Sequence, residues 1–255
     1  MIKKNFIKEK LKKGKPVIGT WSIIPSSINA EIMSSSGLDF IILDQEHGPI
    51  NFETAQNACS ACELHNTSPL MRIGDINKPF IQNALDIGVH GIQIPNIETK
   101  EDAKKVVEYS KYPPQGDRGL SPFTRAGLFD GKNSSELTSQ ANENTLVVLN
   151  IEGKGAVNNL DDILEVEGFD TIFVGLFDLS KSLGIPGEVN SSEVIKTLEK
   201  IIKKTIEAGK TVGTIATSHE TLETFLSLGA TYLVYSVDCD VLRNEYSKVV
   251  EIVNK

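Results

Sequence analysis

Two acidic residues that follow apolar segments are the first candidates for chemistry in this sequence. Glu152 stands in NIEGKGA and Asp178 in VGLFDLS, each at or just beyond the end of a run rich in Val, Ile and Leu. If these runs are neighbouring strands of a barrel, both carboxylates lie at its mouth. Taken singly, each carboxylate would more simply cap a helix or pair with a lysine. Their joint placement instead predicts a site for Mg²⁺, Mn²⁺ or Co²⁺, which all accept carboxylate oxygens.

Such a metal ion would suit the chemistry of a 2-oxo acid. Bound to the carboxylate and keto oxygens, it would lower the cost of removing a proton from the adjacent carbon. Arg72, within an earlier apolar run, would place a planar positive group beside the same oxygen. Its alternative role is an ion pair with Asp44 or Glu46. We predict His47 of DQEHG as the acid/base, because it follows a strand end among carboxylates that raise its basicity.

Other routes to catalysis have weaker support. Many aldolases use a lysine that forms a Schiff base, but Lys154 and Lys181 both lie beyond the apolar runs. Cys59 and Cys62 form a CxxC, yet they fall in a segment of helical pattern with no second Cys/His pair nearby, so we expect neither a zinc site nor a redox site. The sequence has no GxSxG elbow and no Walker glycine loop, which disfavours hydrolases and nucleotide-phosphate enzymes.

The elements that must position these residues alternate along the chain. Short apolar runs typical of buried parallel strands are separated by segments of helical periodicity, several of which end at a glycine. Eight strands in about 250 residues predict one (β/α)8 TIM barrel over residues 1–255, with an open doubly wound sheet as the lesser alternative. The predicted strands are Val17–Trp21, Asp39–Leu43, Pro69–Ile73, Gly91–Pro95, Leu146–Ile151, Thr171–Gly175, Thr211–Ala216 and Thr231–Val237.

Composition excludes several classes of function. The formal net charge of −8 disfavours a nucleic-acid surface. The sequence shows neither a signal-peptide core nor an apolar run long enough to cross a membrane, and its three cysteines favour a reducing compartment, so we expect a cytoplasmic protein. The segment Tyr112–Thr145 is too long for a plain βα connection, and we expect it to be functional or interfacial.

Several motifs together resemble the HpcH/HpaI aldolases, the class II pyruvate-dependent aldolases, across nearly the whole chain. They are LDQEHGP, the arginine of LMRIGD, NALDIGVHGIQIP, YPPQGDRG, NIEGKGAVNNLDDIL and FVGLFDLSKSLG. The resemblance implies a barrel of the phosphoenolpyruvate/pyruvate type that reversibly cleaves a 4-hydroxy-2-oxo acid to pyruvate and an aldehyde. It also implies that Asp86 of ALDIG orients His47, and that the protein is a hexamer, a trimer of dimers, in which the last helix, Cys239–Val253, packs at a subunit interface.

Some positions depart from the family pattern. Leu176 and Phe177 replace the proline and alanine of GPADLS, and Asn150 replaces a glutamine. These changes concern the substrate, so two alternatives stay open: a related lyase for citramalyl- or malyl-type substrates, and a family member that only binds a 2-oxo acid. We predict that the substrate is contacted by Arg72, Asn150, Phe177 and Asp178, with Asp44 and Glu46 in support.

Overall fold

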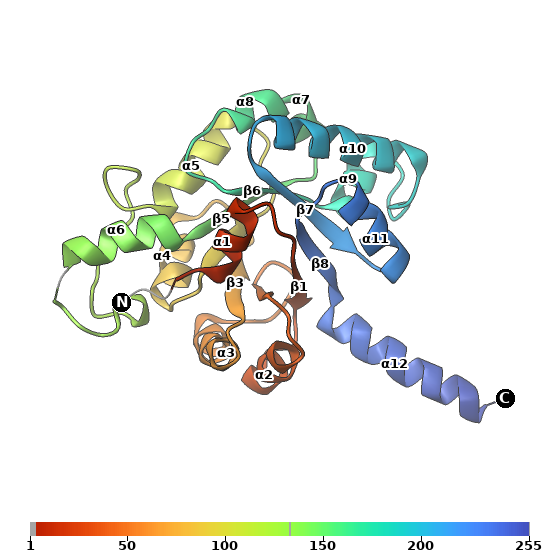
Figure 1. Cartoon of the computed structure of the whole chain (residues 1–255), viewed down its shortest axis with the longest axis horizontal. Coiled ribbons are helices and arrows are strands. Elements are labelled where there is room, and N and C mark those ends of the chain that lie inside the picture. The colour runs from red at the N-terminus through yellow and green to blue at the C-terminus, as the bar shows by residue number, and fades with distance from the viewer. Residues whose placement is uncertain (1–3, 133, 255) are drawn as a thin grey trace.

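Eight parallel strands close into a barrel in chain order (Figure 1). The computed structural model describes residues 4–132 and 134–254. The strands are β1 (Val17–Ser22), β2 (Phe40–Asp44), β3 (Ser68–Arg72), β4 (Gly91–Ile94), β5 (Leu146–Ile151), β6 (Thr171–Val174), β7 (Thr211–Ala216) and β8 (Tyr232–Val237). Each predicted strand is present, with its ends within one residue of the prediction. The predicted TIM barrel is therefore confirmed.

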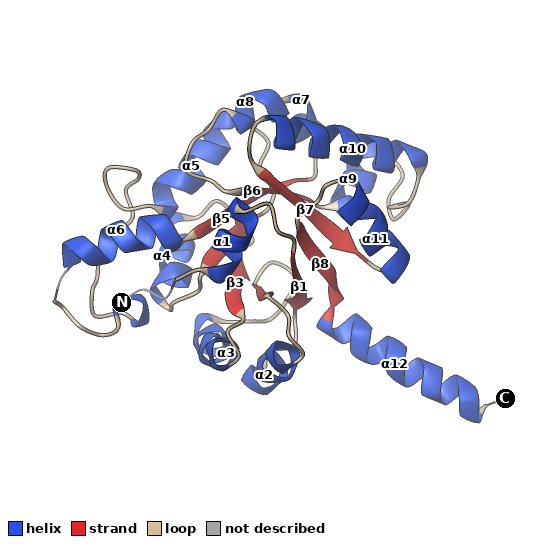
Figure 2. Ribbon diagram, in the orientation of Figure 1, coloured by secondary structure: helices blue, strands red, loops and turns tan. Residues whose placement is uncertain are grey.

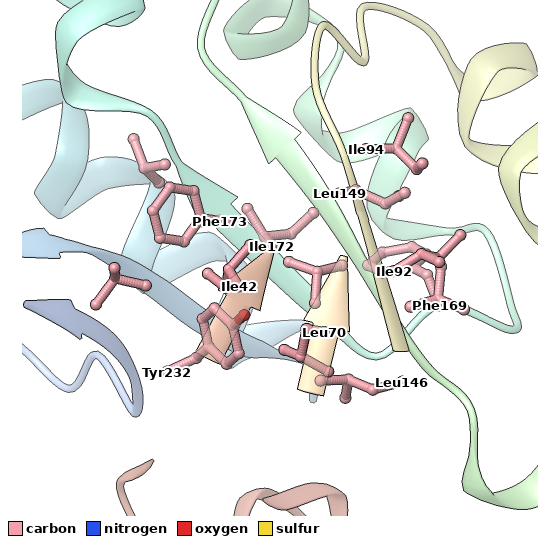
Figure 3. Packing of buried hydrophobic residues seen from close by; sticks show 14 of the residues in the cluster. Ile42, Leu70, Ile92, Ile94, Leu146, Leu149, Phe169, Ile172, Phe173 and Tyr232 are labelled. Carbon is pink, nitrogen blue, oxygen red and sulfur yellow. The ribbon is translucent and has the colours of Figure 1, made fainter. Parts of the chain in front are cut away.

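The barrel closes where β8 pairs with β1, from Val17 opposite Tyr232 to Trp21 opposite Val237. Nearly every strand residue is buried, as expected for parallel strands covered by helices on one side and filled by side chains on the other. Phe173 and Tyr232 meet edge to face in this core, where Figure 3 shows them close to Ile42 and Ile172.

Helices surround the barrel (Figure 2). They are α1 (Phe6–Lys12), α2 (Ser27–Ser35), α3 (Phe52–Leu64), α4 (Lys78–Asp86), α5 (Lys100–Ser110), the 3-10 turn η1 (Arg125–Gly127), α6 (Ser134–Asn144), α7 (Lys154–Asn158), α8 (Leu160–Leu164), α9 (Leu176–Leu183), α10 (Ser192–Glu207), α11 (His219–Ser227) and α12 (Asp238–Val253). Several helices end at a glycine, as expected: Gly37, Gly88, Gly209 and Gly229 follow helices and take the positive φ that other residues avoid.

The long connection between β4 and β5 contains a helix that the sequence pattern did not predict. After α5 the chain passes through η1 and then forms α6, whose sequence is almost entirely polar. Only Ala141 and Asn142 of α6 are buried, so the helix has almost no apolar stripe to detect.

Helix α1 lies at the amino-terminal end of the barrel, opposite the mouth (Figure 1). Its Lys8 ammonium binds the carbonyl oxygen of Thr145 at 2.9 Å and the Asp170 carboxylate at 2.9 Å. The Asn5 side chain, which caps α1, also donates to the carbonyl oxygens of His90 at 2.8 Å and Asn144 at 2.9 Å. The first helix of the chain is thus tied to the segments that lead into β4, β5 and β6.

Helix α12 extends away from the barrel (Figure 1) and leaves many apolar side chains uncovered. The more exposed of these include Tyr246, Val249, Val250, Ile252 and Val253. Among the described residues, no helix is long and apolar enough to cross a membrane.

Candidate active site

The predicted site residues stand at the carboxyl ends of neighbouring strands. Asp44 and Arg72 are the last residues of β2 and β3, Glu152 directly follows β5, and Asp178 lies in the first turn of α9 after β6. Because the strands are parallel, these residues share the mouth of the barrel, where barrel enzymes carry their active sites.

Arg72 is held rigidly by two carboxylates and an aromatic ring. Its Nε and Nη2 donate to the two Asp44 carboxylate oxygens at 2.8 and 2.5 Å, and its Nη1 lies 2.9 Å from Glu46 Oε2. The centre of the guanidinium stands 4.0 Å above the Trp21 ring, which in turn packs edge to face on Phe173. The alternative role of Arg72, an ion pair with Asp44 or Glu46, is therefore observed with both residues. These ion pairs fix the orientation of the guanidinium at the mouth of the barrel.

Asp44 also shapes the loop that carries His47. One of its carboxylate oxygens accepts the backbone N–H groups of Glu46 at 3.0 Å and His47 at 3.4 Å. The His47 side chain is 64% exposed, and its Nε2 lies 4.0 Å from Glu46 Oε2. Burial raises the pKa of Glu46, while Arg72 and His47 oppose this rise. The imidazole is therefore open to solvent at the rim of the barrel, beside a carboxylate.

Glu152 is the buried member of the predicted metal pair. Only 6% of the residue is exposed, and its carboxylate accepts the backbone N–H of Asn96 at 2.8 Å. Burial raises the pKa of Glu152 to about 7, and the nearby Glu46 and Asp178 carboxylates act in the same direction. A Cβ atom at Gly175 would come within 2.3 Å of Glu152 Oε2, so only glycine lets the start of α9 approach this carboxylate so closely.

A chain of buried polar groups leads from the barrel interior to Glu152. The Tyr232 hydroxyl donates to Gln93 Oε1 at 3.2 Å, the Gln93 amide donates to Asn150 Oδ1 at 2.8 Å, and the Asn150 amide lies 3.4 Å from Glu152 Oε2. Asn150, predicted to contact the substrate, is 1% exposed, and its side chain contacts both Gln93 and Glu152. Sequence analysis missed Gln93 and Tyr232; a lone glutamine inside the apolar run GIQIP was the available signal.

Asp178 and Phe177 lie on the first turn of α9, which begins directly after the Gly175 cap. The Asp178 side chain is 47% exposed, and its nearest cation is Lys181, one helical turn along, at 3.5 Å. Leu176 is buried under the turn, whereas Phe177 is 52% exposed at the rim. The two departures from the family pattern thus leave a short regular helix start that presents Asp178 toward the mouth.

These residues fit a divalent cation. Burial raises the pKa of Glu152 and of Glu46, the charge of Asp178 adds to both rises, and Arg72 is already paired with Asp44 and Glu46. A cation between Glu152 and Asp178 would neutralise this excess charge with the hard oxygen donors that Mg²⁺ and Mn²⁺ prefer. The described residues contain no group of three or more His, Cys, Asp or Glu able to hold a metal ion, so other ligands would have to be water and substrate.

The structure does not bring Asp86 to His47 within one chain. Helix α4 runs from the mouth back to the amino-terminal end of the barrel, and Asp86 is its last residue. There its carboxylate accepts a 2.7 Å hydrogen bond from Arg118, which stacks on Tyr112. The predicted partnership between Asp86 and His47 is absent from the single chain, because the two residues lie at opposite ends of the barrel.

The lysines and the CxxC cysteines that could have offered other chemistry lie outside the strands. Cys59 and Cys62 are buried on one helix, and burial raises the pKa of Cys62 to about 11 and that of Cys59 further. Lys154 begins α7, and Lys181 lies within α9, so neither projects from a strand. Burial lowers the pKa of Lys111 to about 7, but this lysine binds the carbonyl oxygens of residues 142 and 145 at the other end of the barrel.

Comparisons with known proteins identify the family of this chain. A family model described as HpcH/HpaI aldolase/citrate lyase matches residues 18–245. The 2-keto-3-deoxy-L-rhamnonate aldolase of Escherichia coli K12 is 34% identical over 234 residues, which cover 92% of this chain and 87% of that protein.

Two solved structures are similar over nearly their whole length. An HpcH/HpaI aldolase from Desulfitobacterium hafniense DCB-2 has a TM-score of 0.93 at 30% identity, covering 98% of this chain and 97% of that one. A citrate synthase has a TM-score of 0.88 at 29% identity, covering 97% of this chain and 96% of that one. With its closed barrel and its acidic mouth, the chain belongs to the HpcH/HpaI aldolase/citrate lyase family and is an aldolase, a carbon–carbon lyase.

Proposed function

We propose that this protein is a divalent-metal-dependent aldolase that reversibly cleaves a 4-hydroxy-2-oxo acid to pyruvate and an aldehyde. The observation that carries the proposal is the fixed guanidinium of Arg72 at the same barrel mouth as the buried carboxylate of Glu152 and the more exposed carboxylate of Asp178. Such an arrangement offers a cation site and a rigid hydrogen-bond donor where negative charge develops on a keto oxygen.

Glu152 and Asp178 would hold the metal ion, which when bound acts as a Lewis acid toward the 2-oxo acid. Arg72 would stabilise the charge on the keto oxygen without moving, since Asp44, Glu46 and Trp21 already fix it. The contacts with Asp44 and Glu46 use three of the five guanidinium N–H groups, so two would remain for the keto oxygen.

His47 would move the protons. Its exposed imidazole would accept the proton of the 4-hydroxyl group as the bond between C3 and C4 breaks, and would return a proton to C3 of pyruvate. The resemblance assigns Asp86 to orient this histidine. Because Asp86 and His47 lie at opposite ends of one barrel, we propose that any such contact joins two chains of an oligomer.

The aldehyde half of the substrate would lie on the open side of the site, next to Phe177. A half-exposed benzyl group at this rim favours an aldehyde with an apolar end. The relative from Escherichia coli, named for 2-keto-3-deoxy-L-rhamnonate, makes 3-deoxy-2-oxo acids of sugars the first compounds to test.

The experiment separates metal-dependent cleavage from its alternatives. Pyruvate release from 2-keto-3-deoxy acids should require added Mg²⁺, Mn²⁺ or Co²⁺ after EDTA treatment, and Glu152→Gln should abolish it. Exchange of the pyruvate methyl protons in D₂O, followed by NMR, should show the same metal requirement. Cleavage that survives complete metal removal contradicts the mechanism.

Two further outcomes would select a different function. Because the chain is similar to a citrate synthase, oxaloacetate and citramalyl-type compounds are the second group of substrates to assay. Activity with these compounds alone would favour the related lyase. Metal-dependent binding of pyruvate or oxalate by calorimetry without any proton exchange would support a protein that binds 2-oxo acids and does not turn them over.

A further inference from the structure

A buried carboxylate next to the site has no role in the chemistry described so far. Asp238, the first residue of α12, is only 4% exposed. Its Oδ2 accepts hydrogen bonds from the Ser22 hydroxyl at 2.9 Å, the Ile24 N–H at 3.1 Å and the Asn29 amide at 2.7 Å. Its Oδ1 accepts the N–H groups of Ile23 at 3.2 Å and of the following residue at 2.7 Å.

No cation pairs with Asp238 among the residues that the structure describes; every contact just named is a hydrogen-bond donor. Burial of a carboxylate costs free energy unless several hydrogen-bond donors satisfy it. The hydrogen bonds therefore hold the donor groups in place as well as the carboxylate of Asp238. Three of them, from Ser22, Ile23 and Ile24, lie where β1 leaves the barrel, directly after Trp21.

The end of β8 is bent in a way that presents Asp238 to β1. The register between β1 and β8 shifts after Gly19, and Ser236 takes a φ of +49°. Such an irregularity re-aims the residues that follow it, and a non-glycine residue at positive φ is retained where surrounding contacts hold it. The Ser236 hydroxyl donates to Asp240 at 2.6 Å, which helps to hold the bend.

The loop that Asp238 fixes presses on the loop of His47. A Cβ at Gly48 would lie 3.2 Å from Ile23 Cα and 3.3 Å from Ile23 Cβ, so these two segments are in direct contact. On the other side, a Cβ at Gly74 would lie 3.5 Å from Glu46 Cα. The segment with Glu46 and His47 is therefore held between the loop after β1 and the loop after β3.

We propose that Asp238 is a positioning residue for the aldol reaction: by holding Ile23 and Ile24 through their backbone N–H groups, it keeps the loop after β1 against Gly48 and so fixes His47. The inference rests on the proposed function. It also means that the first residue of α12 supports the active site. A displacement of the start of α12 would therefore displace His47.

The test variant is Asp238→Asn, which keeps the shape of the side chain. In either orientation, the NH₂ group of the new amide would face at least two of the groups that now donate hydrogen bonds to Asp238. Those hydrogen bonds would be lost, so the loop after β1 should become more mobile. Glu245→Gln is the matched control, because it removes the same charge from an exposed position of the same helix. Ser22→Ala, which removes one donor only, is a milder variant in case Asp238→Asn folds poorly.

Two measurements decide the proposal. Hydrogen exchange by mass spectrometry should show faster exchange over residues 22–29 and 45–50 in Asp238→Asn, a smaller change in Ser22→Ala, and none in Glu245→Gln. For cleavage, kcat should fall about 10- to 100-fold, because small misplacements of a reacting group are that costly, while KM changes little. If Asp238 had only a structural role, the variant would contain a smaller fraction of folded, active protein. The kcat per active site of the folded protein would then be unchanged.

Unchanged exchange at residues 45–50, or an unchanged kcat in a variant whose loop has loosened, would overturn the proposal. If the wild-type protein shows no aldol activity, the proposed function fails, and the exchange pattern alone decides whether Asp238 holds the two loops together.

Discussion

The Arg72→Lys variant tests the central feature of the site. Arg72 makes three charged contacts with Asp44 and Glu46 and stacks on Trp21, whereas a lysine has a single nitrogen and no planar fork. Asp44 is 1% exposed, so in the variant this buried carboxylate would retain only part of its pairing. Hydrogen bonds to charged groups contribute about 1.5–3 kcal/mol each, and a lysine would replace at most one or two of the three.

We therefore expect the free energy of unfolding in urea to fall by about 3 kcal/mol. The exchange of pyruvate methyl protons in D₂O should slow by about 100- to 1,000-fold, as when a fixed donor to a developing oxyanion is lost. Arg125→Lys is the matched control, because Arg125 is similarly buried and binds Glu63 at 2.8 Å away from the mouth. It should lose stability and keep its exchange rate.

Two results would refute the reasoning. If Arg72→Lys retains more than a third of the wild-type exchange rate, the fixed fork is not needed for enolisation. If the variant is as stable as the wild type within about 0.5 kcal/mol, the network around Asp44 does not depend on the guanidinium.

Three further predictions concern other parts of the molecule. Burial lowers the pKa of Lys111 in the folded protein to about 7, below its unfolded value, so above pH 7 the unfolded chain binds one proton more than the folded chain. The free energy of unfolding of the wild type, relative to Lys111→Met, should therefore rise by about 2 kcal/mol from pH 7 to 9 in urea titrations. A difference that does not change with pH would contradict this. Phe177→Ala should shift the ratio of kcat/KM from apolar toward polar aldehydes by about tenfold, with pyruvate proton exchange as the unchanged control. The double variant Val249→Glu, Ile252→Glu should reduce the predicted hexamer to smaller species in light scattering, and an unchanged mass would exclude this face of α12 from the interface.

The fold was readable from sequence because its signals are local. Each buried parallel strand is a short apolar run, and glycines with positive φ, such as Gly88 and Gly229, mark the helix ends. Helix α6 escaped prediction because its pattern is polar almost throughout and its stability comes from contacts such as the Asn142 side chain with the backbone of Tyr112.

The site was predictable only in part. The mouth position of Arg72 and Glu152 follows directly from the strand ends, since parallel strands all finish on the same side. The fixed orientation of Arg72 also depends on its stacking on Trp21, which lies on a strand about 50 residues earlier. No spacing rule in the sequence predicts that stacking. In the same way, Gln93 and Tyr232 reach Glu152 only because closure of the barrel brings β4, β5 and β8 around one interior.

Helix α1 has a consequence for the order in which the molecule is assembled. Asn5 and Lys8 bind the carbonyl oxygens of His90 and Thr145 and the carboxylate of Asp170, so α1 can find all its partners only after some 160 further residues are in place. Contacts so distant along the chain form late in folding, because a long loop must close first. We therefore expect α1 to dock after the strands have formed, at the amino-terminal end of the barrel.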